Sequence, residues 1–255
     1  MRLTHFILRF RLKSPTNEKT LVSRHCISVN TLSMAALTAM FMLAALQTRA
    51  QDGELQKRVT EIKEYLALNK MVLAQYRWQE SQTVSVKGEV KKEELFQVQM
   101  GPDGQPQKTN LSPDESSGGR KHGIKHRIKE DYENYGKEVA ALAQSYGQPE
   151  PGRVQQLFEQ GSVLLGSAGA PNEVKLVING YKKPGDSVTI VFNKTQKTIQ
   201  SLHIATYLND PQDAVTISEQ YAQLPNGPNH VASTVVDGVS KQLTVQMQNS
   251  NYQKM

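Results

Sequence analysis

The sequence is poor in cysteine, in aromatic residues and in long apolar runs. Cys26 is the one thiol among 255 residues, and it lies near the N-terminus. A single cysteine excludes an internal disulfide and a multi-cysteine metal site. Aromatic residues make up 6% of the chain, whereas glutamine, serine, threonine and asparagine are abundant. This profile is typical of a well-hydrated domain that is rich in β-structure.

An apolar segment covers Met34–Leu46 and is interrupted only by Thr38. It is shorter than the roughly 20 residues that a membrane-spanning helix needs. Basic residues precede it and the small-residue site Thr48-Arg49-Ala50 follows it, which is the order of an export signal. We predict a leader over residues 1–50, cleaved near Ala50, and a periplasmic or secreted protein of a bacterial cell envelope. An uncleaved anchor and a buried core helix are the alternatives.

The positive charge of the chain is concentrated in this leader. Residues 1–50 hold seven of the 30 basic residues and one of the 24 acidic residues. The rest of the chain is therefore neutral, although the whole chain carries a formal charge of +6. Because nucleic-acid binding needs a basic surface on the folded domain, no nucleic acid partner is expected. After cleavage the protein is not expected to be an integral membrane protein.

Helical periodicity appears in three segments after the leader. Leu55, Val59, Ile62 and Leu66 predict a helix over about residues 52–74. A longer apolar stripe with three tyrosines predicts a second helix over residues 124–146, which ends before Gly147. A short third helix is expected around residues 153–160. The central helices thus form a pair.

Alternating apolar residues predict strands on both sides of the helical pair. Two strands are expected between Tyr76 and Met100, and six more between Glu173 and the end of the chain. Residues 102–123 are rich in Gly, Pro, Ser, Asn and Asp and are predicted to form a mobile loop. We therefore predict a single α+β domain over residues 51–255. Its curved antiparallel sheet, an open or half β-barrel, presents a concave apolar face that the N-terminal helix and the central helical pair cover.

A cluster of basic residues lies at the start of the second predicted helix. Arg120, Lys121 and Lys125 predict a contact with an anion such as a phosphate or an anionic lipid, and a solvated helix start is the alternative. His122 and His126 have the spacing of a metal-binding pair, but neighbouring cations disfavour a divalent ion, so no metal is expected. The sequence contains no catalytic motif and no phosphate-binding glycine loop. We expect neither an enzyme nor a cofactor.

The segments Tyr76–Glu80 and Val84–Gly88, which open a strand pair that reaches Pro102–Gly104, carry a family resemblance. Together with the leader, the first helix and the late strands, they resemble the periplasmic lipoprotein-carrier fold of outer-membrane lipoprotein sorting. The resemblance implies an unclosed β-barrel that is capped by helices and holds acyl chains. It is a resemblance of architecture, and no ligand motif of the family is matched.

These observations lead to one functional hypothesis and one alternative. The exported domain is expected to bind an apolar or amphiphilic ligand, a lipid or a lipoprotein acyl chain, between the sheet and the helices. The alternative is an envelope domain that interacts with another protein and binds no small ligand. The residues expected to contact the ligand lie on the second predicted helix and at the start of the first strand: Trp78, Ile128, Tyr132, Tyr135, Val139 and Leu142.

Overall fold

The structure is a computed structural model that describes residues 50–102, 104–112, 124–146 and 153–255. Its helices are α2 (Ala50–Leu73), α3 (Ile124–Tyr146) and α4 (Arg153–Glu159). Its strands are β1 (Tyr76–Val86), β2 (Glu89–Met100), β3 (Pro106–Asn110), β4 (Val163–Ser167), β5 (Glu173–Asn179), β6 (Ser187–Asn193), β7 (Thr198–Tyr207), β8 (Ala214–Gln223), β9 (Asn229–Gly238) and β10 (Leu243–Lys254).

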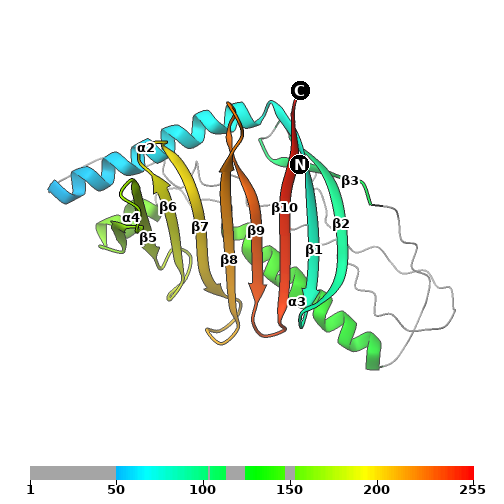
Figure 1. Ribbon diagram of the computed structural model, residues 1–255. Coiled ribbons are helices and arrows are strands. Elements are labelled where there is room, and N and C mark those ends of the chain that lie inside the picture. Colours follow the sequence, from blue (N-terminus) through cyan, green and yellow to red (C-terminus); the bar gives the residue numbers. More distant parts are fainter. Residues whose placement is uncertain (1–49, 103, 113–123, 147–152) are drawn as a thin grey trace.

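All ten strands belong to one antiparallel sheet. Its order is β3-β2-β1-β10-β9-β8-β7-β6-β5-β4, so β3 and β4 are the two edges. Figure 1 shows this order from β3 to β5. Nearly every neighbouring pair is a hairpin of consecutive strands. The exception is β1 with β10, which joins the first part of the chain to the last. This pairing makes one sheet of segments that the helices separate in sequence.

The first hairpin shows how local sequence sets the register. Val86 pairs with Glu89, so Lys87 and Gly88 form a two-residue loop. Both loop residues have a positive φ, 54° for Lys87 and 77° for Gly88. Positive φ at both positions matches the right-handed twist of the strands and fixes their alignment.

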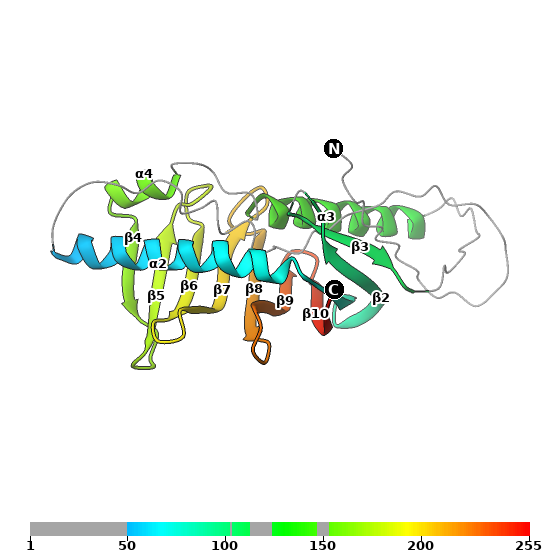
Figure 2. The same ribbon diagram turned by 90° about the horizontal axis from the view of Figure 1, so that it is seen from above.

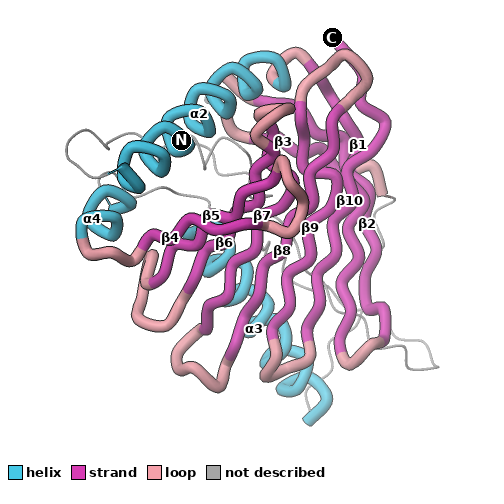
Figure 3. Tube along the Cα trace, turned by 60° about the vertical axis from the view of Figure 1, so that its left-hand side comes forward, coloured by secondary structure: helices cyan, strands magenta, loops and turns pink. Residues whose placement is uncertain are grey.

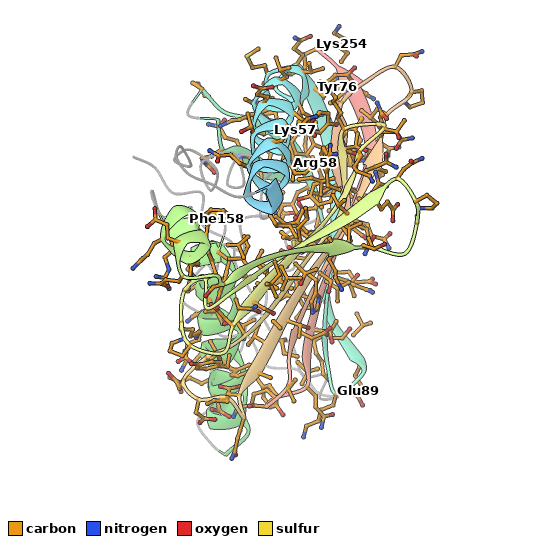
Figure 4. The ribbon with its side chains drawn as sticks, turned by 90° about the vertical axis from the view of Figure 1, so that its left-hand side faces the viewer. Lys57, Arg58, Tyr76, Glu89, Phe158 and Lys254 are labelled. Atoms are coloured by element: carbon orange, nitrogen blue, oxygen red, sulfur yellow. The ribbon has the colours of Figure 1, made fainter. Side chains whose placement is uncertain are left out.

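The helices lie on one side of the sheet, which we call the inner face (Figures 2 and 3). Helix α2 contacts β7 and β9, whereas α4 contacts β4 and β5. Helix α2 lies toward the strand ends marked by Tyr76 and Lys254, and α3 lies toward the opposite ends, near Glu89 (Figure 4). The two long helices therefore cover opposite ends of the same face.

The inner face contains the apolar core, and the other face is polar. In β5, β6 and β7 the buried residues alternate with more exposed ones, as a sheet with one covered face requires. The opposite face carries Ser81, Thr83, Thr216, Ser218 and Gln246 in the central strands. These outward residues are hydrated, so the core lies between the sheet and the helices.

The structure confirms the predicted fold class, an α+β fold with a curved antiparallel sheet that is not closed into a barrel. The three predicted helices and eight predicted strands are present. Two strands were not predicted. Residues 106–110, assigned to a loop, form β3, and residues 163–167, assigned to the end of the helical section, form β4. Residues 113–123 of the predicted loop lie outside the described residues.

The prediction of an apolar concave face was wrong in one respect. Several fully buried positions of the inner face are polar or charged, and they gather on the strands around the β1–β10 junction. Glu80 and Glu219 have no exposed surface, and Gln82 and Thr234 are 1% exposed. These four buried polar residues belong to the candidate site that is described below.

Candidate ligand-binding site

One row of directly paired residues crosses the inner face from β2 to β4, at right angles to the strands. Each member is paired with the next on the neighbouring strand. The line, which we call the inner row, is Glu94, Gln82, Met247, Thr234, Glu219, Leu202, Ile190, Leu176 and Leu165. It is mainly polar on β2, β1, β10, β9 and β8 and wholly apolar on β7, β6, β5 and β4. The inner face therefore changes character across one sheet.

The polar half of the inner row holds hydrogen-bonding groups without partners. Both amide atoms of Gln82, the hydroxyl of Thr234 and Oε1 of Glu219 are buried, and none of them meets a hydrogen-bond partner among the described residues. A buried polar group without a partner costs about 1–3 kcal/mol, and native proteins contain few such groups. They lie close together, on β8, β9 and β1, with Met247 of β10 between Thr234 and Gln82, and this points to a polar molecule that would satisfy them.

Glu80 lies beside this row and is held by an ion pair. It is two residues from Gln82 on the same face of β1. Lys108, from the edge strand β3, brings its Nζ to 2.5 Å from Glu80 Oε1, and both side chains are almost fully buried. The second oxygen, Oε2, is buried and has no hydrogen-bond partner in the described structure. The ion pair neutralises the charge and leaves one acceptor available.

Glu219 is neutralised in a different way. It is fully buried, and burial raises the pKa of this carboxyl to about 8, although the hydrogen bond from Tyr221 opposes the rise. The Tyr221 hydroxyl donates to Oε2 at 2.6 Å. At pH 7 Glu219 is therefore mostly protonated, and its acid group can donate as well as accept a hydrogen bond.

An aromatic cluster closes the α2 end of the polar half. The Trp78 ring stacks on Tyr252 with centroids 5.4 Å apart, and His230 contacts the same tyrosine at 4.3 Å. Trp78 Nε1 donates to Asn249 Oδ1 at 3.0 Å, so the indole is both buried and satisfied. Burial and the nearby charge of Glu80 raise the pKa of the Tyr252 hydroxyl.

Helix α2 is fixed to the sheet by two asparagines. Asn69 Nδ2 donates to the carbonyl of Asn229 at 2.8 Å, and the amide of Asn229 donates to Asn69 Oδ1 at 2.7 Å. The side chain of Asn229 also donates to the carbonyl of Ile199. This reciprocal contact places α2 over the start of β7 and β9.

Helix α3 is fixed at the other ends of the strands by its tyrosines. The Tyr135 hydroxyl donates to Asp213 Oδ1 at 3.0 Å. Near the end of the helix, the Tyr146 hydroxyl donates to Asp186 at 2.5 Å and lies 2.7 Å from the Thr206 hydroxyl. Both contacts are made to the inner face or to the turns that border it, so α3 is tied to the sheet along its length.

The predicted ligand-contacting residues occupy two separate places. Tyr135 and Val139 are buried under α3, and Tyr132 and Leu142 pack against the core. Trp78 lies at the other end of β1, about 26 Å along the strand from Val86, the end that α3 approaches. The structure does not bring the two places into contact. It joins them through the inner face, where the sequence predicted a ligand between the sheet and the helices but named none of the residues of the inner row.

Four of the predicted site residues cannot be placed in this way. Arg120 and Lys121, from the predicted anion contact, lie outside the described residues. Lys125 and Ile128 belong to α3, but their side chains are not described. The anion contact and the role of Ile128 remain predictions. None of the helices in the described ranges is long and apolar enough to cross a membrane.

Two solved structures are similar in fold to this chain. A LolA superfamily protein from Nitrosomonas europaea is 8% identical, with a TM-score of 0.37 over 76% of this chain and 93% of that one. A DUF1329 family protein from Desulfovibrio piger is 11% identical, with a TM-score of 0.37 over 76% and 92%. Both likenesses concern the fold alone. No protein-family model and no curated protein matches the sequence.

Proposed function

We propose that this protein is an exported, non-catalytic binding protein of the cell envelope that holds an amphiphilic ligand against the inner face. The supporting observation is the inner row. An apolar surface on β7, β6, β5 and β4 continues into polar residues on β8, β9 and β1, with Met247 of β10 among them. A molecule with an apolar chain and a polar end has the same order of surfaces.

Two contributions to the binding free energy would favour such a ligand. The apolar half is built from Leu202, Ile190 and Leu176, each at most 2% exposed, so an apolar chain that replaced the side chains now covering them would contribute about 25 cal/mol for each Å² of its own surface removed from water. The polar half offers buried groups that need a partner. One ligand that covers both halves gains both contributions.

Export is proposed from the leader predicted over residues 1–50. The test is N-terminal sequencing of the protein recovered from an envelope fraction of cells that express the whole chain. A new N-terminus at Gln51 supports export with cleavage after Ala50. Recovery of the intact chain from the cytoplasm would overturn this part of the proposal.

The binding test uses a photoreactive single-chain lipid, a diazirine-bearing monoacylglycerol, with peptide mapping of the adducts. We expect adducts on inner-face residues of β6, β7 and β8, and their loss when unlabelled lipid is added in excess. Adducts confined to outward residues, or no adducts above background, would contradict the proposal.

Two neighbouring positions on β7 offer a matched pair of variants. Leu202 faces the helices and His203 faces the opposite side. Leu202→Trp places a large ring on the ligand surface and should abolish the adducts, whereas His203→Trp should leave them unchanged. Circular dichroism of both variants checks that the sheet is retained, so that loss of binding is not loss of fold.

A second candidate function is the pairing of edge strand β4 with an extended segment of another envelope protein. Strand β4 contains no charged residue and its Leu164 is 53% exposed, whereas the other edge, β3, has the protective residues Pro106 and Lys108. If this pairing is the function, Leu164→Lys should abolish complex formation in envelope extracts without changing the lipid adducts.

A further inference from the structure

The polar half of the inner row restricts what kind of amphiphile fits. This inference rests on the proposed function and concerns the chemistry of the ligand's polar end. The groups without partners include an amide donor, an amide acceptor and a hydroxyl, from Gln82 and Thr234. A ligand group that both donates and accepts hydrogen bonds would satisfy them.

Charge is the second restriction. Of the three carboxyl groups in or beside the polar half, Glu80 is paired with Lys108 and Glu94 is paired with Lys92, whereas the buried Glu219 accepts a hydrogen bond from Tyr221. Lys108 and Lys92, the cations that form ion pairs there among the described residues, are therefore each already paired with a carboxylate. An anionic headgroup would therefore compete with a carboxylate for its cation or be buried without a counter-ion, and both are unfavourable.

The length of the apolar half is the third observation. From Glu219 to Leu165 the inner row crosses four strand spacings, or about 19 Å at about 4.8 Å for each spacing. All positions beyond Glu219 are apolar: Leu202, Ile190, Leu176 and Leu165. A single extended acyl chain that displaced the side chains covering these positions could follow this line, with its polar end at Thr234 and Gln82.

We propose that the ligand is a single-chain amphiphile with an uncharged polar end that carries hydroxyl or amide groups. Its polar end contacts Gln82 and Thr234, and its chain runs across β7, β6 and β5 toward β4. An anionic end is disfavoured because Lys108 and Lys92 are already paired with Glu80 and Glu94.

The test compares three probes with the same oleoyl chain: 1-oleoylglycerol, which is neutral with two hydroxyls, oleate, which is anionic, and methyl oleate, which is neutral without a donor. Affinities are measured at pH 7 by displacement of an apolar fluorescent dye. We expect 1-oleoylglycerol to bind at least tenfold more tightly than either other probe, because two net hydrogen bonds change affinity by that order.

Variants at the polar half test whether Gln82 and Thr234 cause the preference for 1-oleoylglycerol. Gln82→Leu and Thr234→Val replace the polar groups with apolar groups of similar shape, so the fold should be kept. They should reduce the preference for 1-oleoylglycerol over methyl oleate to within about threefold, with methyl oleate itself little changed. Thr83→Val, on the outward face of the same strand β1, is the matched control and should leave the preference intact.

The outcomes separate this inference from the proposed function. If all three probes bind equally, or oleate binds most tightly, the uncharged hydroxyl or amide end is refuted and the binding function stands. A preference that survives both substitutions would likewise refute the assigned residues. If none of the three probes displaces the dye, the binding function itself fails.

Discussion

The substitution Glu219→Gln gives a prediction whose sign follows directly from the buried carboxyl. Burial raises its pKa from 4.5 to about 8. The folded chain therefore binds more protons at this group than the unfolded chain between these two values. The stability that comes from the protonated carboxyl is fully present below about pH 4.5 and is lost as the pH rises to about 8.

The size of this effect follows from the shift. One pKa unit corresponds to about 1.4 kcal/mol, so the free energy of unfolding should fall by up to roughly 5 kcal/mol across this range. Glutamine has no charge to gain, and its carbonyl can still accept the hydrogen bond from Tyr221. The variant should therefore be less stable than or equal to the wild type at pH 5 and more stable at pH 9.

Urea unfolding at pH 5, 6, 7, 8 and 9 measures this difference. The difference between wild type and variant isolates Glu219, because burial of His230, which lowers the pKa of that imidazole, affects both proteins equally. Glu93→Gln, at an exposed position of β2, is the control and should give parallel curves. If Glu219→Gln also gives a curve parallel to the wild type, the argument about the neutral polar half is refuted.

Two further predictions test how the helices are fixed over the inner face. Asn69→Ala removes both hydrogen bonds with Asn229 and should lower the free energy of unfolding by about 2–3 kcal/mol. Amide hydrogen exchange should become faster in α2 than in α3. Unchanged exchange in α2 would contradict the assigned contact. In Gly238→Ala the new Cβ would lie 2.6 Å from the Tyr135 hydroxyl, so the free energy of unfolding, measured by thermal or urea unfolding, should fall by about 1–3 kcal/mol. Gly166→Ala, whose Cβ meets nothing within 4 Å, is the control and should not lower it. Equal stability of the two variants would show that α3 does not pack there.

The elements that the sequence predicted are those with a strong period. The stripe of α3 and the alternation in β5, β6 and β7 come from burial of one side of each element, so their periods are written into the chain. The edge strands differ. In β3 only Pro106 is buried, and in β4 only Val163. With one neighbouring strand and little buried surface, neither carries a clear alternation, and both were missed.

The candidate site could be predicted only in part from the sequence, for a different reason. Glu80 and Gln82 lie in phase with Trp78 and Val84 on the buried side of β1, and Glu219 lies in phase with the buried residues of β8. A polar residue in phase with an apolar alternation was the available signal. Their alignment across strands depends on the pairing of β1 with β10, which joins residues far apart in sequence and leaves no local trace.

The central claim is that the inner face holds an amphiphile, and native mass spectrometry of the chain tests it most directly. The protein is purified without detergent and measured as isolated and after addition of 1-oleoylglycerol. We predict one bound molecule of lipid mass for each folded chain after 1-oleoylglycerol is added. The Leu202→Trp variant should carry no bound molecule under the same conditions. A folded chain that remains free of ligand at excess 1-oleoylglycerol, oleate and methyl oleate would contradict the claim.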